Sequence, residues 1–105
     1  MFGFFSKEER YAVRSPKWKT VRKNHLKEQP RCQACDSKKD LEVHHIVPVH
    51  VDPDMELDPS NLVTLCSKCH FCFGHLYDYK SWNPNVVEDT DKFFKKVKHR
   101  PYDLN

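Results

Sequence analysis

The chain has 105 residues, of which 38% are apolar and 31% are charged. A chain of this size forms one small domain with a limited hydrophobic core, so disulfides or a bound metal are expected to stabilise it. Its start lacks the apolar run of a signal peptide, and no segment approaches the run of about 20 apolar residues that spans a membrane. We therefore expect a soluble protein of a reducing compartment, where cysteines bind metals more often than they form disulfides.

The net charge of +3 is unevenly distributed along the chain. Residues 1–31 carry +6, residues 32–79 carry −5 and residues 80–105 carry +2. An acidic centre between basic arms fits a metal site held against a polyanion. Taken alone, however, the charge is explained more simply by basic faces in contact with solvent.

The first predicted element is a helix in SPKWKTVRKNHLKEQP, residues 15–30. Ser15 can cap it, Pro16 suits the first helical position and Pro30 ends it. A period of 3.6 residues puts an apolar side and a basic stripe on opposite sides of this helix. The apolar side consists of Trp18, Val21, His25 and Leu26, and the stripe, which could contact phosphates, of Lys19, Lys23 and Lys27.

A β-hairpin is predicted next, followed by two helices. Residues 41–49 (LEVHHIVPV) are rich in β-branched residues and favour a strand, and residues 61–65 (NLVTL) favour a second one that returns antiparallel. The acidic, proline-broken segment between them is expected to be a long loop. A helix should begin near Ser67, and 89–101 (DTDKFFKKVKHRP) predicts an amphipathic basic helix with Phe93, Phe94 and Val97 on one face.

Four of the five cysteines form two C-x-x-C pairs, which are Cys32 with Cys35 and Cys66 with Cys69. Together they supply the four thiolates of a tetrahedral structural zinc site. The second pair, followed by His70, also fits a c-type haem attachment motif, but that would leave the other cysteines unexplained. Cys72 lies outside both schemes and is expected to be a small buried side chain.

The segment between the two pairs contains His44 and His45, and later Asn61. Neighbouring strand residues point to opposite faces, so a twist or bulge could let one histidine bind a metal while the other meets the substrate. His70 directly follows the last cysteine of the second pair. His75 lies five residues further on, about 140° around an ideal α-helix, which is poor geometry for a shared metal. We expect it to contact phosphate or to pack, with a third metal ligand as the less favoured alternative.

These motifs, CQAC, LEVHHIVPV and NLVTLCSKCH in this order, resemble the HNH endonucleases whose ββα-metal site is braced by a four-cysteine zinc. The resemblance implies an α+β fold, a small zinc-braced ββα-metal (His-Me finger) domain with flanking basic helices. The boundaries expected are an N-terminal extension at 1–14, a nuclease domain at 15–84, and an amphipathic basic helix with a tail at 85–105, packed on the domain or flanking it.

The resemblance also implies roles for single residues. His45 corresponds to the general base that takes a proton from the attacking water, and Asn61 orients it by a hydrogen bond across the hairpin, through either its side chain or its backbone. His44 and His70 hold one catalytic divalent ion. The first metal position is often an acid in the family, and a histidine there shifts the plausible metals from Mg²⁺ alone to Mn²⁺, Ni²⁺, Co²⁺ or Zn²⁺ as well.

The implied function is metal-dependent cleavage of DNA, as a nick or a double-strand break, that leaves 5′-phosphate and 3′-hydroxyl ends. The lysine stripe and His75 are the candidate substrate contacts. The resemblance further implies a monomer or weak dimer in the cytoplasm of a bacterium or phage-infected host, with a phage terminase or another DNA-processing protein as a partner. The alternative is a zinc-braced module that binds nucleic acid or protein without catalysis, which would not explain the clustered His44, His45, Asn61 and His70.

Overall fold

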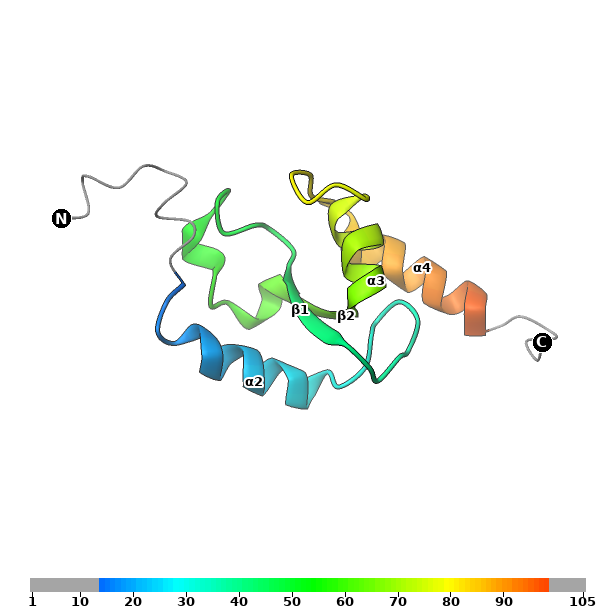
Figure 1. The fold of residues 1–105 in the computed structure, drawn as a ribbon, viewed down its shortest axis with the longest axis horizontal. Helices are drawn as coiled ribbons and strands as arrows, with labels where there is room; N and C mark the ends of the chain where they lie inside the picture. The colour runs from blue at the N-terminus through cyan, green and yellow to red at the C-terminus, as the bar shows by residue number, and fades with distance from the viewer. Residues whose placement is uncertain (1–13, 99–105) are drawn as a thin grey trace.

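The computed structural model describes residues 14–98, and Figure 1 shows their fold. A two-stranded antiparallel hairpin forms the centre, with strand β1 at Leu41–His45 and strand β2 at Leu62–Cys66. Helix α2 packs against one side of this hairpin, and helix α3 with the π-helical turn η4 packs against the other. The predicted order of helix, hairpin, helix and further helix is therefore confirmed.

Helix α2 spans Trp18–Glu28 and ends before Pro30, as predicted. It begins two residues later than expected, because the Ser15 hydroxyl accepts a hydrogen bond from the Lys17 backbone N–H (3.2 Å) and forms a turn ahead of the helix. Its apolar side is partly buried, whereas the lysine stripe is exposed. The stripe is therefore free of the packing that holds α2 on the hairpin.

The two strands pair in an uninterrupted register from Leu41 opposite Cys66 to His45 opposite Leu62. β1 ends at His45 and so is shorter than the predicted strand, because the Val47 N–H beyond it donates to the Asn61 side chain and not to β2. The loop between the strands contains two short 3₁₀-helical turns, η2 at Pro53–Met55 and η3 at Pro59–Asn61. Each is capped by an aspartate that accepts a hydrogen bond from the backbone N–H two residues later (Asp52 and Asp58).

Helix α3 is a single turn at Ser67–Cys69 that continues into η4 at His70–Gly74. Helix α4 follows at Val86–Lys98 and begins before the predicted position because Asn83 organises its first turn. The buried Asn83 side chain accepts from the Asn85 N–H and donates to the Phe73 carbonyl, which ties α4 to η4. Phe93 lies at the edge of the packed face of α4. Its side chain contacts the ring of Phe73 and is 37% exposed.

The core is small, as the composition predicted. Its buried members are three cysteines and four apolar residues from the hairpin, the turn after α2 and the start of α4: Cys32, Ala34, Val63, Leu65, Cys66, Cys69 and Val86. Cysteines thus take the place that large apolar residues hold in bigger domains. None of the helices found between residues 14 and 98 is long and apolar enough to cross a membrane.

Candidate metal centres and active site

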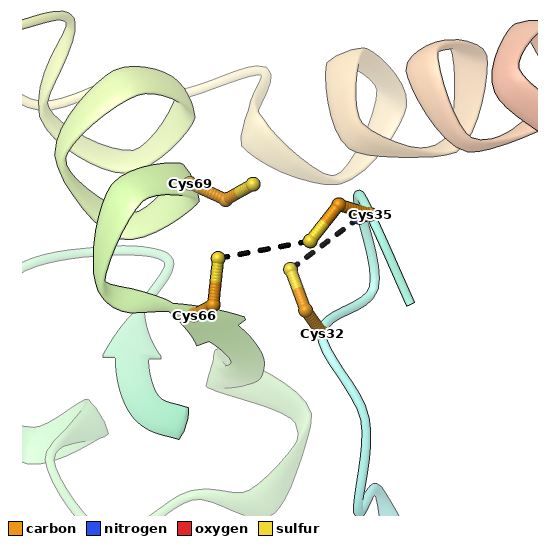
Figure 2. A group of neighbouring side chains, drawn as sticks. All are labelled: Cys32, Cys35, Cys66 and Cys69. Atoms are coloured by element: carbon orange, nitrogen blue, oxygen red, sulfur yellow. Dashed lines mark hydrogen bonds between the residues drawn. The ribbon is translucent and has the colours of Figure 1, made fainter. Parts of the chain in front are cut away.

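The four paired cysteines converge on one point, as Figure 2 shows. Cys32 and Cys35 lie in the turn after α2, and Cys66 and Cys69 lie at the end of β2 and in α3. Their sulfur atoms all lie within 4.8 Å of one another, and those of Cys35 and Cys66 are 3.7 Å apart. Tetrahedral zinc with Zn–S bonds of about 2.3 Å requires sulfur separations of about 3.8 Å. The cysteine cluster therefore has the dimensions of a structural zinc site.

The chemistry of these thiols points the same way. Burial raises the pKa of the Cys69 thiol, and the neighbouring Cys32 raises it further. Burial also raises the pKa of Cys35. Four thiolates, three of them on buried cysteines, cannot share this space without a cation, because each disfavours the charge on the others. Cys72 lies outside the cluster and is half-buried, in keeping with its expected exclusion from the zinc site.

A second cluster consists of three histidines, His44 from β1, His70 from η4 and His75 directly after η4. Their ring centroids are 4.8 to 5.1 Å apart. The Nε2 atoms of His70 and His75 are 3.2 Å apart. Zinc ligated by imidazole nitrogens at about 2.05 Å in a tetrahedron requires a separation of about 3.3 Å. The cluster therefore has the size of a metal site.

Two of these rings are oriented by outer partners. The Nδ1 atom of His70 bonds to the Glu42 carboxylate, and that of His75 donates to the Ser81 carbonyl (2.9 Å). Both Nδ1 atoms are thus occupied as donors in the neutral rings, which leaves the Nε2 lone pairs to face each other. Carboxylates and carbonyls play this part behind histidine ligands of metals.

His44 completes the cluster with an atom that lacks a partner. Its Nε2 is buried and makes no hydrogen bond to any residue in the range 14–98. Burial lowers the pKa of His44 to about 3, and His70 and His75 add to the effect. A neutral imidazole with an unpaired buried nitrogen fits a metal ligand, because coordination supplies the missing partner.

The position of His75 differs from the expectation. In an α-helix His75 would point away from His70, but η4 is π-helical, and residues five apart in a π-helix lie near one another on one face. Gly74 permits this arrangement. A Cβ added at Gly74 would lie 2.9 Å from Cε1 of His44 and 3.0 Å from its Nδ1.

His44 and His45 point to opposite faces of the hairpin, as alternation requires, and no bulge is present in the register of β1. His44 faces η4, whereas the ring of His45 lies 4.6 Å from that of Trp18 in α2. Both are buried, and both border the same open pocket because β1 ends at His45. The end of β1 thus places two imidazoles, those of His44 and His45, at one pocket.

His45 has a defined hydrogen-bond partner, the backbone carbonyl of Glu56 at 2.9 Å from Nε2. A carbonyl only accepts, so Nε2 carries the proton in the neutral ring and Nδ1 keeps its lone pair. Burial lowers the pKa of His45, and the positive charge of Arg14 contributes, against the raising effect of the Glu56 carbonyl. The ring is therefore neutral near pH 7 and able to accept a proton.

Asn61 does not bond to His45, which corrects the expected contact. Its side chain accepts from the Val47 N–H (2.8 Å) and donates to the carbonyls of Val47 (3.0 Å) and Met55 (3.2 Å). It is 2% exposed and so joins the two ends of the loop from inside. This loop carries Glu56, whose carbonyl then orients His45. Asn61 and His45 are therefore both bonded to this loop, Asn61 at Val47 and Met55 and His45 at Glu56.

The pocket beside these histidines has a volume of about 240 Å³. No carboxylate is found among its lining residues in the described range, which are Arg14, Val43, His44, His45, Pro48, Val49, His50, His70, His75, Tyr79, Ser81 and Trp82. No sequence motif identifies Arg14, Glu42, Glu56 or Trp18 as part of the site. They become visible only when the loop and α2 are placed around the hairpin.

A β-hairpin followed by a helical segment, with a four-cysteine cluster on one side and a histidine cluster on the other, defines the class as a small zinc-braced ββα-metal domain of α+β type. Residues 32–74 match the family described as HNH endonuclease. This match confirms the resemblance to the HNH endonucleases that was inferred from the motifs. No curated protein and no solved structure gives a significant match to the chain.

Proposed function

We propose that the protein is a metal-dependent DNA endonuclease in which His44, His70 and His75 hold the catalytic divalent cation and His45 is the general base. The proposal rests on the histidine cluster and on His45, which lie next to each other at the end of β1. Three imidazoles converge, two of them with Nδ1 bonded to an oxygen acceptor, and a fourth imidazole beside them keeps a free Nδ1. The match of residues 32–74 to the HNH endonucleases supports nuclease activity.

Each residue of the site has a definable task. His45 accepts a proton from the water that attacks the phosphorus, and the Glu56 carbonyl stabilises the resulting imidazolium through Nε2–H. Asn61 keeps that carbonyl in place by bridging Val47 and Met55. A divalent cation, when bound, supplies Lewis-acid stabilisation of the phosphate and of the departing 3′ oxygen. The products would carry 5′-phosphate and 3′-hydroxyl ends.

The donor set guides the choice of metal. Three neutral imidazoles without a carboxylate suit Zn²⁺, Ni²⁺, Co²⁺ or Mn²⁺ better than Mg²⁺, which prefers oxygen ligands. The four cysteines hold a separate structural zinc, since a closed set of thiolates leaves no open position for chemistry. Two metals with different roles would thus occupy opposite ends of the α3–η4 segment.

Exposed cations on α2 provide a surface for the DNA backbone. Lys19, Lys23 and Lys27 are exposed, and none of them forms an ion pair within the described part of the chain. The helix starts at Trp18, which touches His45, so this row of charge leads away from the active site. Binding through such contacts is sequence-independent and weakens with salt.

The test is cleavage of supercoiled plasmid by the wild type and by His45→Ala, each with EDTA, Mg²⁺, Mn²⁺, Ni²⁺ or Zn²⁺. We expect metal-dependent cleavage that is lost in His45→Ala and kept in His25→Ala, a histidine of α2 that lies outside the pocket. Zinc content measured on all three proteins shows that the fold is intact. Absence of cleavage by the wild type in every metal, with zinc and DNA binding retained, would favour the binding module.

A further inference from the structure

Arg14 lines the pocket next to His45, and Trp18 contacts both of these residues from the start of α2. The ring of Trp18 lies 4.6 Å from the ring of His45 at an interplanar angle of 32°. The guanidinium carbon of Arg14 lies 5.3 Å from the centroid of the Trp18 ring. One indole therefore contacts both the imidazole that would accept the proton and a guanidinium at the pocket.

The segment that carries Arg14 and Trp18 is bonded to Glu56, the residue whose carbonyl orients His45. The Ser15 N–H donates to the Glu56 carboxylate at 3.1 Å, while the Glu56 carbonyl accepts from His45 Nε2. The Trp18 N–H donates in turn to the Ser15 carbonyl at 3.0 Å. Arg14 therefore directly precedes a residue that is tied both to the loop and to the start of α2.

The charge of the pocket explains what Arg14 can bind. Arg14 is the one residue with a permanent charge among those of the described range that line the pocket, and no carboxylate there is available to neutralise it. It is also exposed, so its guanidinium can reach a ligand. A guanidinium presents donors in a planar fork that matches two oxygens of a phosphate.

We infer that Arg14 binds a phosphate of the strand that is cut, and that Trp18 is a positioning residue that fixes both Arg14 and His45. The inference rests on the proposed nuclease function and adds two residues to it, both outside the segment that matches the family. Arg14 would hold the phosphate from the α2 side of the pocket, opposite the histidine cluster. Trp18 would keep the guanidinium and the imidazole at a constant separation.

The first experiment compares Arg14→Gln, Arg14→Lys and Arg22→Gln. Arg22 is an exposed cation of α2 that does not line the pocket, so its variant loses the same charge elsewhere. Removal of one donor to a developing charge typically costs about 10²–10³-fold in rate. We expect a loss of kcat of about 10²-fold for Arg14→Gln at saturating DNA, partial recovery in Arg14→Lys, and no change in kcat for Arg22→Gln. Equal kinetics of Arg14→Gln and Arg22→Gln would overturn the inference for Arg14.

The second experiment compares Trp18→Phe with Trp18→Leu. Phenylalanine keeps an aromatic face for both neighbours, whereas leucine does not. We expect Trp18→Phe to retain most of kcat and Trp18→Leu to lose kcat with little change in KM, while zinc content and the melting temperature of the two variants agree. A parallel loss of kcat and melting temperature in both variants would reduce Trp18 to a packing residue.

A binding measurement separates failure of this inference from failure of the proposed function. The Nε–Hε resonance of Arg14 is followed by NMR as a single-stranded DNA tetranucleotide is added to zinc-loaded protein without a catalytic metal. We expect this resonance to shift more than that of Arg22. A shift without cleavage in any metal would refute the nuclease but retain the phosphate contact, whereas cleavage without a shift would refute the contact alone.

Discussion

The Nε2 atoms of His70 and His75 lie 3.2 Å apart while both Nδ1 atoms are engaged, one with Glu42 and the other with Ser81. Two facing lone pairs repel each other, and the unpaired Nε2 of the buried His44 lies beside them. A cation removes the repulsion and supplies the missing partner for all three rings. Hydrogen bonds outside the histidine cluster thus orient His70 and His75 as the proposed metal site requires.

Replacement of His75 by glutamine tests whether three histidines are needed. We expect His75→Gln to weaken binding of Co²⁺ or Ni²⁺ at the histidine cluster by at least about 10-fold, since even outer partners of metal ligands are worth that much. The measurement is calorimetric titration of zinc-loaded protein with each ion, supported by absorption spectra of the Co²⁺ form. The His25→Gln variant should match the wild type. Unchanged affinity in His75→Gln would return His75 to the expected role of a substrate contact.

Substitution of Gly74 should act on the metal site through packing alone. The added Cβ of Gly74→Ala would lie 2.9 Å from Cε1 of His44, so the ring or η4 must move. We expect weaker metal binding and a loss of about 1–3 kcal/mol in the free energy of unfolding, as for other overpacked interiors. Denaturant unfolding and metal titration measure the two effects.

A double variant provides the control for Gly74. Truncation of the ring in Gly74→Ala/His44→Ala removes the clash, so the free energy of unfolding should exceed that of Gly74→Ala. Metal binding should stay weak, because a ligand is missing. If the double variant is instead less stable than either single variant, steric contact with His44 is not the reason for glycine at this position.

The parts of the fold that sequence could predict depend on local rules. The two C-x-x-C pairs predicted the cysteine cluster because ligand spacing within each turn is fixed by the chain itself. Alternation along the strand predicted that His44 and His45 face apart, and the proline positions predicted where α2 ends. Each inference used neighbours within a few residues.

What sequence could not predict depends on contacts between distant segments. No residue pattern predicts the π-helical geometry of η4, so sequence alone places His75 as in an ideal α-helix, away from His70. The partner of His45 is a backbone carbonyl of the long loop, and any residue at position 56 could supply it. For the same reason the contact of Trp18 with His45 could not be read from a helix that predicted only an apolar side.

Replacement of one zinc ligand should prevent both zinc binding and folding. Cys32, Cys66 and Cys69 belong to the hydrophobic core, and free energy of zinc binding is folding free energy in such domains. We expect Cys69→Ser to lose the structural zinc and its cooperative thermal transition, measured by metal analysis and circular dichroism. Cys72→Ser changes a cysteine outside the cluster and should keep both. A folded, cooperative Cys69→Ser protein would show that the core suffices without zinc.

The pH dependence of cleavage should reflect the lowered pKa of His45. A general base acts unprotonated, so kcat/KM rises with pH through the pKa of the base and then levels off. Burial and the charge of Arg14 place this pKa below the ordinary value of 6.5, and a dication at the histidine cluster lowers it further through like charge. We therefore expect an acidic limb below pH 6.5 and a plateau through neutral pH, measured at saturating metal so that proton competition for its ligands does not contribute. A limb centred above pH 6.5 would mean that His45 is not the group whose deprotonation controls the rate.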